Sequence, residues 1–228
     1  MKISTTLYFD RANKQLGDVQ GELTKTQEQL STGKQIVKPS DSPDKASLVT
    51  RLESELSRQA SYQNTLKSVN TRLQTEETAL KNTSDVMTRI KELAIQAASD
   101  NLSSADRQSI ALEINSLRDQ VLSLANTQDT NGNYLFSGSR VGSPAFGKDA
   151  KGQLVYQGDE SRMKVAVGDN RRMNLNMPGS DAFVKVIRDD GKGNKVGIGF
   201  FQAIDDLANA VKNSDHNQMQ RGIAEIDT

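Results

Sequence analysis

The chain offers little for catalysis, because it contains one histidine, His216, and no cysteine. His216 follows Asp215 at the start of an expected helix, and an imidazole beside a carboxylate is a common pair for proton transfer. A solvated neighbour of a helix cap explains the same two residues without a catalytic role, and we prefer that interpretation. One imidazole without a thiolate also cannot build a metal cluster.

Two loop-like stretches match ligand-binding sequences only in part. Asp129, Asn131 and Asn133 have calcium-loop spacing at three positions, but Tyr134 stands where that loop needs glycine. The glycine-rich stretch 191–197 has neither dinucleotide-loop spacing nor the Gly-Lys-Ser/Thr ending of a P-loop, so a β-hairpin turn explains it better. We therefore expect no cofactor, no metal site and no enzymatic activity.

Composition argues against several classes of partner. The 228 residues carry 29 basic and 29 acidic side chains, a balance that gives no sign of nucleic-acid binding. The sequence has no apolar run long enough to insert into a membrane. Hydrophobic residues make up 35% and aromatic residues 4%, which is typical of an elongated or bundled protein with thin cores.

Narrow apolar stripes on long helices must organise such a chain. On either side of a break at residues 33–43, apolar residues recur in alternating steps of three and four, a spacing that favours partner helices over a broad core. In the first stripe we expect an assembly surface made by Phe9, Leu16, Val19, Leu23 and Leu30. The expected packing residues of the rod are Leu52, Leu66, Val69, Leu73, Leu80, Met87 and Ile90, with Ile110, Ile114, Leu117, Val121 and Leu124 on the following helix.

Local signals set the expected helix boundaries. The first helix should start near Ser4 or Thr5 and stop at Gly33. The second should start at Pro43, capped by Ser42, and continue to about residue 99, which makes it roughly 80 Å long. A short turn ending at Ser103 or Ser104 then forces the third helix to run antiparallel to the second.

After residue 126 the pattern changes to short β-favouring runs separated by turns. The expected strands are 134–136, 154–156, 163–167, 173–177 and 183–187, and the alternation in 163–167 and 173–177 predicts one buried face on each. Helical spacing returns at Phe200, and a last helix opens near residue 214 and is still running at Thr228, as if cut before its natural end.

The predicted fold is therefore mainly α with an inserted β domain: an elongated antiparallel bundle of long helices, or rod, plus a small antiparallel β domain. Its parts are an N-terminal segment of helix and linker with the expected assembly surface (1–43), an α-helical rod (44–130), the inserted β domain (131–199) and return helices (200–228). The first stripe has no clear cover within the chain, so it is either an association surface or an unfolded tail. Its regular spacing favours association.

Several stretches resemble the flagellin superfamily of bacterial axial proteins. The N-terminal signature of that family is similar to Ile3–Thr5, Gln29–Lys34 and Lys38–Ala46, and its central-rod signature is similar to Arg89–Ala97. Within the superfamily, residues 131–138, 156–159 and 177–183 are closer to the subfamily of the hook–filament junction than to flagellin. Together with the expected layout, the resemblance covers almost the whole chain.

The resemblance implies a structural protein that forms a collar between the flagellar hook and the flagellin filament. Its implied partners are other copies of itself, a neighbouring hook-associated protein, flagellin and an export chaperone. In that family a C-terminal helix pairs with the first helix, and subunits are secreted through the flagellar export channel without a cleaved signal peptide. The alternatives are a flagellin-type filament subunit and, from another class, a generic coiled-coil interaction module.

Overall fold

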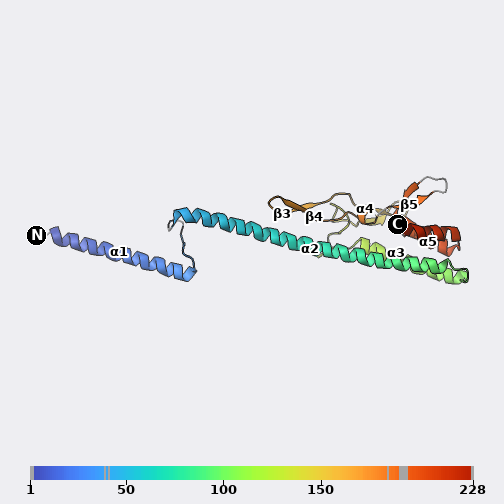
Figure 1. Cartoon of the computed structure of the whole chain (residues 1–228), viewed down its shortest axis with the longest axis horizontal. Coiled ribbons are helices and arrows are strands. Elements are labelled where there is room, and N and C mark those ends of the chain that lie inside the picture. Colours follow the sequence, from blue (N-terminus) through green and yellow to red (C-terminus); the bar gives the residue numbers. More distant parts are fainter. Residues whose placement is uncertain (1–2, 39, 41, 184, 190–194, 227–228) are drawn as a thin grey trace. The chain divides into compact units, whose positions relative to one another are not determined.

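A computed structural model describes residues 3–38, 40, 42–183, 185–189 and 195–226 (Figure 1). The chain divides into two compact units, residues 1–61 and 62–228, and the boundary falls inside one helix. Among the described residues no helix is long and apolar enough to cross a membrane. The elements are α1 (Ile3–Thr32), α2 (Pro43–Ala97), α3 (Ser104–Ala125), β1 (Phe146–Lys148), β2 (Leu154–Tyr156), β3 (Lys164–Gly168), β4 (Arg171–Asn174), α4 (Gly179–Ala182), β5 (Val186–Asp189), β6 (Lys195–Ile198), α5 (Phe200–Lys212) and α6 (His216–Ile226).

The first unit contains α1, the turn after it and the beginning of α2. Gly33 follows α1 with φ of +65°, the left-handed conformation that ends many helices, as predicted. Lys38 forms an ion pair with Glu28 at 3.1 Å, which fastens the turn back onto α1. The predicted start at Pro43 is also confirmed, and the carbonyl of Ser42 accepts a hydrogen bond from the Ala46 N–H.

Two details of this unit differ from expectation or lie outside the description. Helix α1 already begins at Ile3, so Ser4 and Thr5 lie in its first turn and do not precede it as caps. Local propensity fixes such starts only to within one or two residues. Pro39 and Asp41, which belong to the predicted break, lie outside the described residues.

In the second unit, α2 and α3 form the predicted antiparallel helix pair. Ser103 caps α3, and its side chain and that of Asp106 exchange hydrogen bonds with each other's backbone N–H in a capping box. An ion pair of 3.1 Å joins Arg89 of α2 to Glu113 of α3. The antiparallel direction follows from the short turn, which leaves the chain too little length to cross over.

The buried stripe of α2 is turned relative to the predicted one. One set of buried side chains recurs every seven residues and matches the prediction. The buried side chains between the members of this set lie one residue earlier in the sequence than predicted. The side chains of Leu52, Leu66 and Leu73 are exposed, so their packing against a partner helix stays a prediction. The buried α2 residues are Val69, Arg72, Glu76, Ala79, Thr83, Val86, Ile90, Leu93, Ala94 and Ala97.

The buried stripe of α2 is rotated relative to the prediction because of where the neighbouring segments contact the helix. The chain after α3 approaches α2 on the side of Arg72, whose guanidinium donates to the Leu135 carbonyl at 3.0 Å. On this part of α2, burial follows that contact, since Arg72 is buried whereas Leu73 is exposed. The other predicted packing residues are either buried (Val69, Ile90, Ile110, Ile114 and Val121) or half-buried against the same core (Leu80, Met87, Leu117 and Leu124).

The β segments form three separate two-stranded antiparallel sheets: β1 with β2, β3 with β4, and β5 with β6. The strand prediction is wrong in several details: β1 lies outside every expected strand, and β4 ends at Asn174 although a strand over 173–177 was expected. Residues 134–136 form no strand, although Leu135 and Phe136 are fully buried. All four residues of β4 are exposed, so neither face of this strand is buried in the unit.

The β5–β6 hairpin agrees with the hairpin expected around the glycine-rich stretch, and β5 begins at Val186. Residues 184 and 190–194 lie outside the described residues, so the turn itself and the first four residues of the stretch 191–197 are not part of this comparison.

The return helices α5 and α6 complete the core of the second unit. As the helical spacing predicts, Phe201, Ile204, Leu207, Ala208 and Val211 of α5 are buried. An ion pair of 3.2 Å links Arg118 of α3 to Asp205 of α5. From β5, Arg188 pairs with Asp206 of α5 and with Glu225 of α6, so one side chain ties the last hairpin to both helices.

Candidate functional site

The predicted assembly residues of α1 form an exposed apolar stripe. In the first unit the side chains of Phe9, Leu16, Val19, Leu23 and Leu30 are between 60% and 85% exposed. They share one side of the helix because they recur at heptad positions. An exposed apolar stripe of this regularity is typical of a surface that associates with another helix.

The turn between α2 and α3 is held by a residue that sequence analysis missed. The buried guanidinium of Arg107 donates to the carbonyls of Ala97 at 3.0 Å, Leu102 at 3.0 Å and Ser99 at 2.8 Å. These carbonyls lie at and beyond the C-terminal end of α2, where a helix leaves its acceptors unpaired. The sequence did hold a signal for this role: Arg107 is a cation in the first turn of α3, the second helix of the predicted helical hairpin.

The three junction-like sequence stretches meet in one loop cluster. The hydroxyl of Tyr156 donates to the carbonyls of Phe136 at 3.0 Å and Asp159 at 2.7 Å, and the N–H of Gly179 donates to the Phe136 carbonyl at 2.7 Å. Burial raises the pKa of Tyr156. Residues 131–138, 156–159 and 177–183 were quoted for their resemblance alone, and the fold places parts of all three in contact.

Polar side chains lock this loop cluster from within. The Asp159 carboxylate accepts hydrogen bonds from the hydroxyl and N–H of Ser139 and from the N–H of Ser161, which hold its pKa well below the usual range. Buried Asn176 accepts from the Met163 N–H at 2.8 Å and donates to the Ser161 carbonyl at 3.0 Å. The loops therefore have a fixed shape without a regular sheet.

An aromatic core attaches the loop cluster to α5. The ring centroids of Phe146 and Phe201 are 5.1 Å apart, and those of Phe136 and Phe183 are 5.6 Å apart. Of the six phenylalanines in the chain, all except Phe9 take part in these ring contacts. Offset and edge-to-face pairs add stability beyond the area that they bury.

The stretch with partial calcium-loop spacing has a structural role on α2. The Asp129 carboxylate accepts hydrogen bonds from the N–H groups of Asn131 at 2.8 Å and Asn133 at 3.0 Å. It also pairs with Arg72 of α2 at 3.3 Å. Burial acts to raise the pKa of Asp129, but these partners outweigh it, and the pKa lies below its ordinary value.

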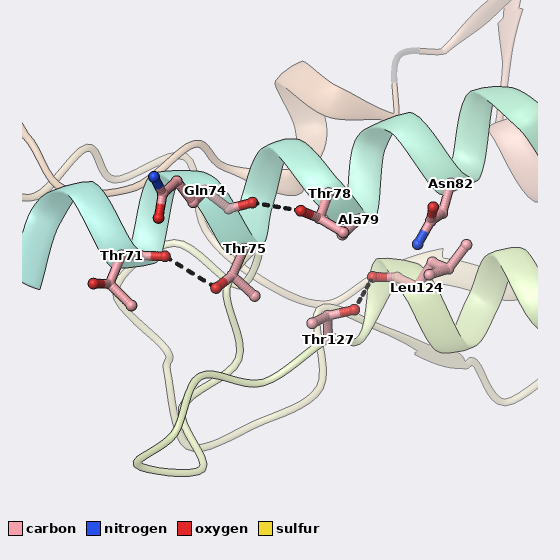
Figure 2. Close-up of a pocket in the computed structure, with 8 residues that line it drawn as sticks. All are labelled: Thr71, Gln74, Thr75, Thr78, Ala79, Asn82, Leu124 and Thr127. Carbon is pink, nitrogen blue, oxygen red and sulfur yellow. Dashed lines mark hydrogen bonds between the residues drawn. The ribbon is translucent and has the colours of Figure 1, made fainter.

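A shallow groove of about 370 Å³ lies between α2 and the end of α3 (Figure 2). Its threonine hydroxyls donate to backbone carbonyls three or four residues earlier, as for Thr75 to Thr71 at 3.0 Å and Thr127 to Leu124 at 2.7 Å. These hydroxyl protons are therefore occupied locally, and the groove presents no acid, base or nucleophile.

His216 lies at the start of α6, where its imidazole Nε2 is 2.8 Å from the Asp100 carboxylate in the turn after α2. Sequence analysis placed it beside Asp215, but Asp215 instead accepts from the Gln218 N–H as a cap of α6. Within the part of the chain that the structure describes, no three His, Cys, Asp or Glu side chains group as a metal site.

Comparison with known proteins supports the resemblance. Residues 3–140 match the family described as the bacterial flagellin N-terminal helical region. Flagellar hook-associated protein 3 of Escherichia coli (strain K12) is 30% identical over 217 residues, which cover 93% of this chain and 67% of that protein. The protein of the same name from Salmonella typhimurium is 30% identical over 183 residues, covering 80% of this chain and 57% of its own length.

A solved structure gives the same result. The flagellar junction protein FlgL of Legionella pneumophila is 30% identical with a TM-score of 0.56, covering 61% of this chain and 45% of that chain. The family match spans more than half of the chain, and the similarity to the Escherichia coli protein extends beyond residue 140 into the β segments and loop cluster. The chain therefore belongs to the flagellin superfamily of bacterial flagellar structural proteins, among its hook-associated protein 3 members.

Proposed function

We propose that this protein is a subunit of the junction between the hook and the filament of the bacterial flagellum, with a structural role and no catalytic one. The observation that carries the proposal is the loop cluster around Tyr156 and Asp159. Tyr156 and Asp159 lie beyond residues 3–140, the helical region matched to flagellin, and they bond to Phe136 and Ser139 at its end. A junction subunit must differ from filament subunits there while keeping the helices that pack along the axis.

The partners that follow from this proposal are other copies of the chain, a neighbouring hook-associated protein on one side and flagellin on the other. The exposed α1 stripe is the surface that we assign to assembly. Because a stripe of this kind would associate prematurely at high concentration, an export chaperone is a further expected partner. Secretion through the flagellar export channel, with an uncleaved N-terminal segment, completes the proposal.

Electron microscopy of isolated hook ends tests this role. The protein is added to hook ends that bear the preceding hook-associated protein, and flagellin is added afterwards. We expect a collar of fixed length from which flagellin grows. Unlimited growth of the protein alone would indicate a filament subunit, and a discrete soluble oligomer without binding to hooks would indicate a coiled-coil module.

A further inference from the structure

A buried carboxyl group on α2 lies where the chain after α3 crosses that helix. Glu76 is 4% exposed and Arg72 is 9% exposed, and Glu76 Oε1 lies 3.3 Å from Arg72 Nε. The N–H of Met177, next to the loop cluster, faces the Glu76 carboxylate. Arg72 in turn holds Asp129 at 3.3 Å and the Leu135 carbonyl at 3.0 Å. Glu76 therefore contacts Arg72 on its own helix and Met177 in the chain that Arg72 holds on that helix.

The charges in this cluster do not balance when both carboxyl groups are ionised. Arg72 supplies one positive charge, and it faces Glu76 on one side and Asp129 on the other. Asp129 also accepts N–H groups of its own loop, which favour its ionised form. Ionised Glu76 would then leave one net negative charge in a buried site, where an excess charge is costly.

Two further observations show that Glu76 is poorly compensated. Glu76 Oε1 and Arg72 Nε are buried, and neither has a hydrogen-bond partner among the described residues because their geometry is not aligned for one. Lys67 lines the adjoining cavity of about 570 Å³, but its side chain is exposed and adds little to the buried site. Met177 contributes only a backbone N–H, which a neutral carboxyl can also accept.

We propose that Glu76 is a proton-dependent contact between α2 and the chain that carries Asp129, Leu135 and Met177. With Glu76 protonated, Arg72 and Asp129 remain as a balanced pair and the chain is held on α2. With Glu76 ionised, the excess charge weakens that attachment. This contact would make the anchoring of the loop cluster depend on pH.

The titration of Glu76 gives the range and the sign of this effect. Burial raises the pKa of Glu76 from 4.5 to about 7, although Arg72 and the Met177 N–H act in the opposite direction. A carboxyl group whose pKa is raised by folding contributes stability that is complete below its unfolded pKa and is lost as the pH rises through its folded pKa. The stability of the protein should therefore fall between pH 4.5 and a little above pH 7.

Urea denaturation followed by circular dichroism tests the proposal on the full chain. Between about pH 5.5 and about pH 8.5 we expect the folding equilibrium constant of the wild type to fall by on the order of thirtyfold. In Glu76→Gln, which cannot ionise, the fall should shrink to less than about threefold. Glu77→Gln removes the exposed neighbouring carboxylate and should keep the fall seen in the wild type. A thirtyfold fall that persists in Glu76→Gln, or no fall in the wild type, would overturn the proposal.

Hydrogen exchange decides the question if Glu76→Gln does not fold. In the wild type the protection factor of the Met177 amide, corrected for the intrinsic rate at each pH, should drop by about tenfold or more from pH 6 to about pH 8.5. A protection factor that stays constant over this range would show that ionisation of Glu76 does not loosen the contact.

Discussion

At the scale of single residues, the loop cluster shows how irregular chain acquires one fixed shape. Tyr156, Asp159 and Asn176 each satisfy two or more backbone groups, which a regular sheet would otherwise pair. Their close approach leaves no room for side chains at some positions. At Gly138 a Cβ would overlap with the Asp159 carbonyl and carboxylate oxygens, and φ is +71°. Glycine is required there for both space and conformation.

Gly138→Ala should therefore destabilise the protein by about 2–4 kcal/mol, the combined cost of a left-handed alanine and an overpacked contact. The measurement is the free energy of unfolding from urea denaturation. Gly142→Ala is the matched control, because a Cβ there meets nothing within 4 Å, and we expect it to change stability by less than about 1 kcal/mol. Equal costs for the two substitutions would mean that the loop cluster is looser than described.

At the scale of elements, α2 shows that burial follows the neighbouring segments and not the leucine pattern alone. Its inward side includes Arg72, Glu76 and Thr83, while Leu66 and Leu73 remain exposed. Arg72 faces inward where it binds the chain after α3 through the Leu135 carbonyl. Buried Thr83 donates to the Ala79 carbonyl of its own helix at 2.8 Å. A helix with such a polar inward side depends on specific contacts more than on apolar area.

A pair of identical substitutions tests the observed orientation of α2. Leu93 is 2% exposed and lies outside the predicted heptad stripe, whereas Leu73 belongs to that stripe and is 37% exposed. Leu93→Ala should cost about 2–5 kcal/mol of unfolding free energy, as expected for a cavity in a packed core. Leu73→Ala should cost less than about 1 kcal/mol, because much of its side chain already contacts water. The reverse order would restore the orientation predicted from the heptads.

At the scale of the whole molecule, the two compact units have different tasks under the proposed function. Residues 62–228 hold the buried core, the loop cluster and the return helices, and this unit supplies most of the stability. Residues 1–61 carry the exposed α1 stripe. Under the proposed function, this division separates the surface assigned to assembly from the buried core.

This separation predicts the effect of placing charges on the stripe. Leu16→Asp combined with Leu23→Asp should leave the unfolding free energy of the 62–228 core unchanged within about 0.5 kcal/mol, because both positions are exposed and lie in the other unit. Incorporation at hook ends should be abolished, since two carboxylates would have to be buried against a partner helix. Electron microscopy and urea denaturation give the two measurements.

The control for this double variant adds the same charge beside the stripe. Gln15→Asp with Thr24→Asp should retain incorporation, because both residues lie off the line of apolar positions and are exposed. If the variant with a charged stripe still incorporates, then α1 does not assemble through these residues.

The sequence by itself determined what depends on local chemistry. Gly33 ends α1 and Pro43 opens α2 because their backbones accept only a few conformations, and Ser103 caps α3 through bonds to nearby residues. The motifs around residues 29–46, 89–97 and 131–138 were enough to indicate the family. These features were predictable because their causes lie within a few residues of one another.

The tertiary structure alone decided which side of α2 faces inward, how three distant loops meet around Tyr156, and why burial raises the pKa of Glu76. The helix pattern could not orient α2, because the direction of burial is set by Leu135 and Asp129, about sixty residues away in the chain. Desolvation and hydrogen bonding likewise depend on neighbours brought together by folding. Such properties belong to the contacts between segments and not to any one segment.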